Sequence, residues 1–264
     1  MSALFINGER ASVEDLKHQA LVNYGAFTSF RVEGGGVRGF DLHLARLEAE
    51  AVELFGVAVP ERSLRDQMRM ALAGRREAWL RVSLFAPQIS MRQPSWVGRP
   101  EVMVGVFDPP ASLPGGMRLQ AQTYAREVPQ LKHAGTFGLV RARRQAVQAG
   151  FDDALFVDGD GRISEGSIWN IGFVQDETVV WPEAPMLAGT GQGLLQRGMA
   201  DLGLRGVTRP VKLSDLADFD AAFICNSATP ACAIAAIDGH QFGLAEALIS
   251  RLIDAWRSNP CQAI

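Results

Sequence analysis

The sequence is poor in cysteine and contains no long apolar run. Its three cysteines, Cys225, Cys232 and Cys261, are an odd number at spacings that suit neither a disulfide framework nor a zinc site. No apolar run approaches the roughly 20 residues that a membrane-spanning helix needs. The first residues also lack the cationic and apolar regions of a signal peptide. These absences predict a soluble, cytoplasmic protein that binds no structural metal.

The charge distribution lacks the basic excess that nucleic acids or membrane surfaces attract. The chain carries 26 basic and 29 acidic residues, a net charge of −3, so we expect neither kind of partner. With 47% hydrophobic and 21% charged residues, its composition is that of an ordinary globular protein. Its 264 residues can build one large or two modest domains.

Several familiar catalytic motifs are absent. The sequence has no dinucleotide-binding glycine pattern, no Walker lysine after a glycine loop and no nucleophile elbow. Four histidines (18, 43, 133 and 240) make no metal-ligand spacing. The segment from Asp158 to Gly161 reads Asp-Gly-Asp-Gly, but the third acidic position and the final glutamate of a calcium loop are missing. We therefore interpret this segment as the turn of a β-hairpin.

Turn and linker residues divide the chain into two predicted domains. The proline- and glycine-rich stretch from Asp108 to Gly116 is the strongest linker signal. We expect a small N-terminal α/β domain over residues 1–112 and a second domain over residues 117–264. Predicted strands cover residues 3–7, 27–33, 37–40, 78–85, 101–107, 117–125, 171–174 and 221–225, with hairpins at 7–8, 34–36 and 153–162. One predicted helix begins with Asp41 as its N-cap and ends at Gly56. The other predicted helices cover residues 63–73, 137–149, the segment after Gly189, and 243–257.

Lysine is the scarce basic residue, and one lysine occupies an unusual position. Only Lys17, Lys132 and Lys212 occur among the 26 basic residues. An arginine-rich genome explains the bias, but a retained lysine can do what arginine cannot, because only an amine forms a Schiff base. Lys132 alone lies among loop signals beside a long helical pattern, in the segment Val128 to Phe137. Taken by itself, a loop lysine is an ordinary surface charge.

Three further segments could complete a site around that lysine. Arg46 lies at the edge of an apolar helical stripe, where its guanidinium can bind a phosphate with two hydrogen bonds. Glu165 follows a hairpin and could pair with a protonated ring nitrogen. The loop from Gly189 to Gly193 leads into a helix whose free N–H groups attract anions, although Thr190 also suits a simple N-cap. Each feature alone has an ordinary structural explanation, but one cofactor, pyridoxal phosphate, would use all four.

In this order and spacing the segments resemble the class IV aminotransferases, the fold-type IV pyridoxal-phosphate enzymes. That family includes branched-chain and D-amino acid aminotransferases and aminodeoxychorismate lyase. The most specific segments read Asn-Tyr-Gly-Ala-Phe at 23–27, His-Leu-Ala-Arg-Leu at 43–47 and Asp-Gly-Asp-Gly-Arg-Ile-Ser-Glu at 158–165, with Asn170 following. The resemblance covers about residues 5–234. It implies two α/β domains, the second a pseudo-barrel, with the cofactor bound between them.

The resemblance also implies residue roles. Lys132 would form the internal aldimine and move a proton between the substrate and the cofactor, and Glu165 would keep the pyridine nitrogen protonated. Arg46 would bind the phosphate, helped by backbone N–H groups at Thr190 and Gly191. The remaining implied contacts are Ser227, Ala228 and Phe137 for the cofactor, and Tyr24, Phe27, Thr28 and Arg81 for the substrate. The implied partners are a small-molecule amino donor and a 2-oxo acid acceptor, and the family works as homodimers.

Four departures from the family pattern leave the reaction open. Residues 189–192 read Gly-Thr-Gly-Gln where relatives often read Gly-Ile-Thr-Arg, and Phe137 replaces a tyrosine of the branched-chain enzymes. Thr28 and the pair Asn226-Ser227 instead resemble the lyase pattern. We therefore predict a transaminase that transfers an amino group from an amino acid or amine to a 2-oxo acid. The alternatives are an aminodeoxychorismate lyase that eliminates pyruvate to give 4-aminobenzoate, and a non-catalytic relative that binds the cofactor or a metabolite.

Overall fold

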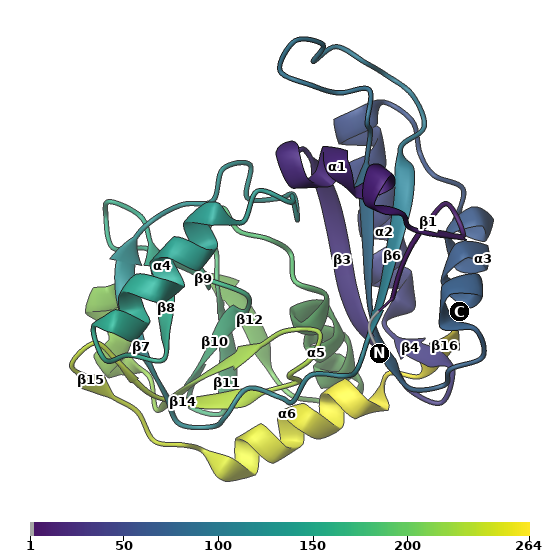
Figure 1. Ribbon diagram of the computed structural model, residues 1–264. Helices are drawn as coiled ribbons and strands as arrows, with labels where there is room; N and C mark the ends of the chain where they lie inside the picture. Colours follow the sequence, from purple (N-terminus) through teal and green to yellow (C-terminus); the bar gives the residue numbers. More distant parts are fainter. Residues whose placement is uncertain (1–2) are drawn as a thin grey trace. The chain divides into compact units, whose positions relative to one another are not determined.

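The computed structural model describes residues 3–264 and divides the chain into two compact units (Figure 1). Unit 1 comprises Met1–Pro110, Leu131–Gly135 and Pro260–Ile264, and unit 2 comprises Ala111–Gln130 and Thr136–Asn259. The division expected from the linker places one boundary near residue 112. The observed units differ from it in that the short segments 131–135 and 260–264 belong with the N-terminal residues.

Unit 1 is built on a five-stranded antiparallel sheet with the strand order β2-β1-β6-β5-β3. The Asn7–Gly8 turn has positive φ at both residues, 51° and 88°, as the twist of a two-residue hairpin requires, and the predicted first hairpin is confirmed. The strands are β1 (Ala3–Ile6), β2 (Glu9–Arg10), β3 (Gly25–Val32), β5 (Ala78–Phe85) and β6 (Glu101–Phe107).

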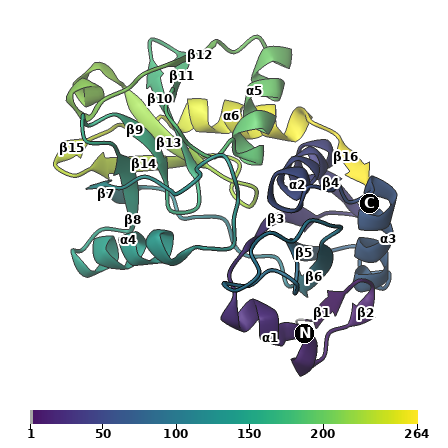
Figure 2. The same cartoon turned by 90° about the horizontal axis from the view of Figure 1, so that it is seen from above.

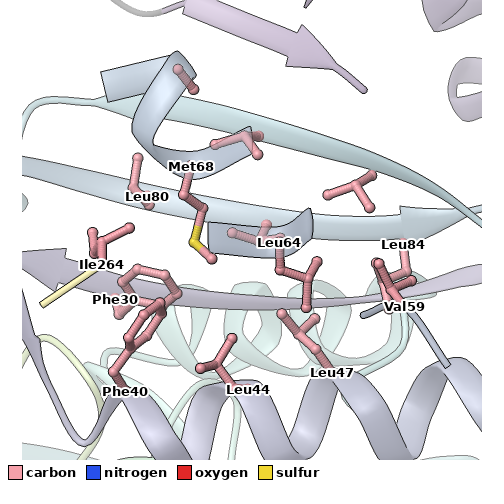
Figure 3. Packing of buried hydrophobic residues seen from close by; sticks show 14 of the residues in the cluster. Phe30, Phe40, Leu44, Leu47, Val59, Leu64, Met68, Leu80, Leu84 and Ile264 are labelled. Carbon is pink, nitrogen blue, oxygen red and sulfur yellow. The ribbon is translucent and has the colours of Figure 1, made fainter. Parts of the chain in front are cut away.

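Two helices, α2 (Phe40–Phe55) and α3 (Glu61–Leu72), cover one face of this sheet. The even-numbered residues of β3, β5 and β6 point toward them, as the two-residue period of a strand dictates. Figure 3 shows the resulting core, in which Phe30 and Leu80 of the sheet lie among Phe40, Leu47 and Met68 of the helices. The odd-numbered residues, including Phe27 and Arg81, therefore lie on the other face.

Two expectations for unit 1 are wrong in detail. Helix α2 begins at Phe40 after a left-handed Gly39, so Asp41 lies in the first turn and is not the N-cap. The second predicted hairpin is reduced to one bridge between Glu33 and Gly36, because β4 (Gly36–Arg38) pairs instead with β16 (Cys261–Ala263). Helix α1 (Val13–Leu21) was not predicted. A Ser12–Asp15 capping box starts it, but it buries no residue.

Unit 2 is a closed six-stranded barrel with strands in the order β10-β13-β14-β7-β8-β9, and pairing of β9 with β10 completes the ring. The β14–β7 and β7–β8 pairs are parallel and the others antiparallel. Figure 2 shows these strands from another direction. The strands are β7 (Met117–Thr123), β8 (Asp153–Val157), β9 (Ile163–Gly166), β10 (Asn170–Gln175), β13 (Ala221–Cys225) and β14 (Cys232–Ile237), extended by β11 (Thr178–Pro182), β12 (Gly206–Arg209) and β15 (His240–Gln241).

Three helices cover the outside of this barrel. Helix α4 (Phe137–Gln148) packs against β7 and β8, and α5 (Thr190–Asp201) packs against α6 (Glu246–Ser258). A short 3-10 helix, η1 (Leu213–Asp218), precedes β13. Apolar side chains fill the barrel interior and a second core separates its wall from α5 and α6. The structure thus confirms the predicted α/β fold class. Within residues 3–264, every helix is too short or too polar to cross a membrane.

Candidate active site

Lys132 lies on a short segment that extends the sheet of unit 1 at its edge strand. The carbonyl of Lys132 accepts a hydrogen bond of 2.9 Å from the Phe27 N–H, and the Ala134 N–H donates to the Gly25 carbonyl at 2.7 Å. Because β3 is the last strand of the sheet, its outer edge is open to such pairing. The backbone of Lys132 is therefore fixed by the sheet, although the residue lies far from β3 in the sequence.

The lysine is held from a second side by helix α2. Its backbone N–H donates to the carboxylate of Glu50 at 2.6 Å, and Glu50 is only 1% exposed. The Lys132 ammonium lies 5.0 Å from the centre of the Phe27 ring. Aromatic faces attract cations at this distance. The half-buried ammonium thus has a defined place beside an aromatic face.

Arg81 lies against the same ring. Its guanidinium carbon is 3.6 Å from the centre of Phe27, a stacking contact typical of arginine. Burial lowers the pKa of Arg81 from its ordinary value, but an arginine at neutral pH stays charged. Tyr24 precedes β3, and its hydroxyl donates to the Leu54 carbonyl at 3.4 Å. Of the four predicted substrate residues, Phe27 and Arg81 are in direct contact with each other.

The fourth predicted substrate residue, Thr28, contacts Arg46. Thr28 is fully buried on the helix-facing side of the sheet, where its hydroxyl accepts a hydrogen bond of 2.5 Å from the Arg46 guanidinium. The same hydroxyl lies 2.6 Å from Nδ1 of His43. Burial, together with the charges of Arg46 and Lys132, holds the pKa of His43 well below its usual range, so this imidazole is neutral.

Unit 2 contains a buried ion pair. Glu165 lies on β9 and is 5% exposed, and one of its carboxylate oxygens is 3.9 Å from Nε of Arg126, itself 8% exposed. Arg126 is not among the predicted site residues, since no periodicity distinguishes an arginine in the irregular stretch after β7. The Glu165 carboxylate therefore lies beside a buried positive charge.

The turn after Glu165 is anchored by a second buried carboxylate. Asp153 is not exposed at all and accepts hydrogen bonds from the Ser167 hydroxyl and the Trp169 indole N–H, each at 2.9 Å. At the end of the turn, the Asn170 amide donates to the Leu187 carbonyl at 2.9 Å. Asn170 therefore ties the strand beside Glu165 to the loop that leads into α5.

The N-terminus of α5 approaches a second loop closely. A Cβ atom added to Gly191 would lie 2.7 Å from the backbone carbonyl of Asn226. The Asn226 side chain in turn accepts hydrogen bonds from the N–H groups of Ala228 and Thr229, at 2.9 and 2.8 Å. The first turn of α5 thus lies directly against the backbone of the loop that carries Ser227 and Ala228.

Thr190 is the first helical residue of α5 and Gly189 is the N-cap, so the interpretation of Thr190 as an N-cap is wrong. Phe137 is the first residue of α4 and its side chain is 78% exposed. Within residues 3–264, no group of three or more histidine, cysteine or acidic side chains is placed to hold a metal ion.

Comparison with solved structures defines the class of fold. The branched-chain amino acid aminotransferase from Escherichia coli superposes with a TM-score of 0.84 at 20% identity, over 97% of this chain and 93% of that chain. The 4-amino-4-deoxychorismate lyase from Pseudomonas aeruginosa gives 0.82 at 25% identity, over 97% and 98%. The structure therefore has the fold of the fold-type IV pyridoxal-phosphate enzymes.

Sequence comparison then shows the family. The family model described as amino-transferase class IV matches residues 25–237, so the chain belongs to the class IV aminotransferases. A probable branched-chain-amino-acid aminotransferase of Rickettsia felis is 25% identical over 256 residues, covering 89% of this chain and 87% of the relative. The predicted family is confirmed. The family uses pyridoxal phosphate, and another branched-chain amino acid aminotransferase of the same fold has been solved with pyridoxamine 5'-phosphate.

Proposed function

We propose that this protein is a pyridoxal-phosphate-dependent transaminase that moves an amino group from an amino acid or amine to a 2-oxo acid. The observation that carries the proposal is the fixed position of Lys132, an amine held by β3 and α2 beside an aromatic face. When bound, pyridoxal phosphate supplies a carbonyl that condenses with amines and a ring that withdraws electrons from the attached carbon.

Residues of unit 1 fit the reactive end and the phosphate of this cofactor. The Lys132 amine is the group that would bind the cofactor carbonyl, and after release it would move the proton at the substrate α-carbon. Arg46 would bind the phosphate, for which its planar guanidinium is suited. Arg81 and Phe27, in contact with one another, would bind the substrate, the arginine through a carboxylate and the ring through apolar contact.

Residues of unit 2 fit the ring nitrogen and the phosphate. Glu165, beside the positive charge of Arg126, would hold a proton on the ring nitrogen. The N–H groups at Thr190 and Gly191 belong to the first turn of α5 and would bind phosphate oxygens with help from the helix dipole. Glycine at position 191 lets the Asn226 loop pack directly against this turn, because the Asn226 backbone closes the space that a Cβ would occupy. Ser227 and Ala228, in the loop that carries Asn226, would line the same phosphate site.

The first test is covalent labelling. We expect the purified protein to bind added pyridoxal phosphate and, after borohydride reduction, to carry the cofactor's mass on the peptide containing Lys132. Lys132→Ala should lose the label, while Lys212→Ala, a lysine on the surface of unit 2, should keep it. A wild-type protein that acquires no label would refute the proposal and favour the non-catalytic alternative. If labelling succeeds, screening amino donors against 2-oxo acids identifies the substrates.

A lyase is the second candidate. The solved lyase from Pseudomonas aeruginosa is 25% identical and matches nearly the full length of both chains, and Thr28 with Asn226-Ser227 resembles the lyase pattern. The two functions differ in their need for an acceptor. Release of pyruvate from aminodeoxychorismate without any 2-oxo acid would favour the lyase. Turnover only when donor and acceptor are both present would favour the transaminase.

We also propose that the chain works as a homodimer, as the family resemblance implies. Sedimentation or light scattering of the purified protein should give twice the mass of one 28.6 kDa chain. A single-chain mass together with full activity would contradict this proposal.

A further inference from the structure

We propose that Thr28 and His43 are positioning residues for Arg46, so that the arginine is oriented for an anionic phosphate before any cofactor binds. This inference rests on the proposed function, in which Arg46 binds the cofactor phosphate. It assigns Thr28 a role behind the phosphate site, whereas the family resemblance implied a contact with the substrate.

The first support is the face of the sheet on which Thr28 lies. The even-numbered residues of β3 point toward α2 and α3, and Thr28, with 0% exposure, follows this alternation between Ala26 and Phe30. Its neighbour Phe27 points to the other face, where it contacts Lys132 and Arg81. The hydroxyl of Thr28 is thus directed at α2, whereas the Phe27 ring lies on the opposite face of the sheet.

The second support is the chain of hydrogen bonds that this hydroxyl joins. The Arg46 guanidinium donates to Thr28 Oγ1 at 2.5 Å, and Oγ1 lies 2.6 Å from Nδ1 of His43. With a neutral imidazole, the hydroxyl can donate its proton to Nδ1 while its lone pair accepts from the arginine. His43 and Arg46 lie three residues apart on α2, so helix and strand together fix both ends of the chain.

The third support is the immobility of the histidine. His43 is 1% exposed, and its ring lies 4.8 Å from that of Phe30, centre to centre, in the core of unit 1. The side chain consequently has no room to turn away from Thr28. An arginine carries many rotamers, and a fixed acceptor removes part of the entropy that it would lose on binding phosphate.

The experiment compares two ligands that differ only in the phosphate. Dissociation constants for pyridoxal phosphate and for pyridoxal are measured by fluorescence on wild type, Thr28→Val and Thr28→Ser. Valine keeps the shape of threonine and removes the hydroxyl, whereas serine keeps the hydroxyl. We expect Thr28→Val to weaken pyridoxal phosphate binding roughly 10-fold, the range for one hydrogen bond to a charged group. Pyridoxal binding should stay unchanged, and Thr28→Ser should restore most of the affinity.

Ser63→Ala is the matched control. The Ser63 hydroxyl also accepts a hydrogen bond from an arginine, Arg99 at 2.7 Å, but lies on α3. Its removal should leave both dissociation constants unchanged. Should Thr28→Val fail to fold, His43→Leu keeps the hydroxyl and removes its second partner. This variant should weaken pyridoxal phosphate binding more than pyridoxal binding.

Two outcomes would overturn the inference. One is a Thr28→Val protein that binds pyridoxal phosphate as wild type does. The other is an equal loss for pyridoxal and its phosphate, which would mean general damage to the unit. Failure of the proposed function gives a different result, because wild type itself would then take up no label at Lys132.

Discussion

Gly191 offers a direct test of the proposed phosphate site, because its replacement by alanine acts on backbone position alone. The added Cβ would lie 2.7 Å from the carbonyl carbon and oxygen of Asn226, and ordinary contact begins at 3.4 Å. The first turn of α5 must therefore move away from the Asn226 loop by the difference, 3.4 − 2.7 = 0.7 Å. A hydrogen bond from the Gly191 N–H to a phosphate oxygen is sensitive to a shift of that size.

Gly191→Ala should change the free energy of unfolding little and the affinity for pyridoxal phosphate strongly. Replacing a helical glycine by alanine stabilises by about 1 kcal/mol, while overpacking costs about 1–3 kcal/mol. Gly191→Ala should therefore lower the free energy of unfolding by no more than about 2 kcal/mol. Losing good geometry in a hydrogen bond to a charged group costs about 1.5–3 kcal/mol, so the affinity for pyridoxal phosphate should fall roughly 10- to 100-fold.

The assay measures urea unfolding of the cofactor-free protein and the dissociation constant of pyridoxal phosphate on the same preparation. Gly159→Ala is the control, because no atom lies within 4 Å of its added Cβ and its φ is not in the left-handed region. It should change neither quantity appreciably. If Gly191→Ala binds pyridoxal phosphate as tightly as wild type, then α5 does not supply the phosphate site.

Three further predictions concern stability. Since the folded pKa of His43 is depressed, the unfolded chain binds a proton below about pH 6.5 that the folded chain does not. The free energy of unfolding should therefore fall as pH falls below that value, by up to about 1.4 kcal/mol per unit for this group, and urea unfolding of His43→Gln should show a shallower dependence. Asp153→Asn replaces the fully buried acceptor of the Trp169 indole N–H, and we expect a loss of about 1.5–3 kcal/mol in the same assay. Gly198→Ala would place a Cβ 1.7 Å from the Ala255 carbonyl oxygen where α5 crosses α6, and thermal unfolding should show a loss of about 2–3 kcal/mol, because neither helix backbone can yield. An unchanged pH dependence in His43→Gln would contradict the first explanation, and unchanged unfolding midpoints in Asp153→Asn or Gly198→Ala would contradict the other two.

The strands and helices that were predicted well are those whose pattern is local. Residues 78–85 and 101–107 form strands with the expected bounds, since strong apolar alternation and flanking turns specify both ends. Strand β14 (Cys232–Ile237) escaped prediction because alanine and cysteine carry little strand preference, and barrel pairing on both sides sets its conformation. Strand β16 depends on pairing with β4, more than 200 residues away in the sequence.

The candidate site shows the same division. Lys132, Arg46 and Glu165 could be proposed from the sequence because the chemistry of each residue type limits its uses. The residues that hold these three in place could not be predicted from the sequence. Glu50 supports Lys132 across 82 positions, and Arg126 meets Glu165 only because unit 2 folds into a barrel. Such contacts arise from tertiary packing, and a single sequence carries no periodic signal for them.

Helix α2 combines a core face that follows from the local sequence pattern with polar contacts that arise from tertiary packing. Leu44, Leu47 and Ala51 pack into the core of unit 1 at helical spacing. The residues directly before them, His43, Arg46 and Glu50, recur at the same period and point toward β3 and the Lys132 segment. Because core packing already fixes the backbone of α2, placing these three polar residues costs no further backbone entropy. Weakening the core under α2 should therefore disturb the lysine and the arginine together, whereas changes at Thr28 alone should reach only the arginine.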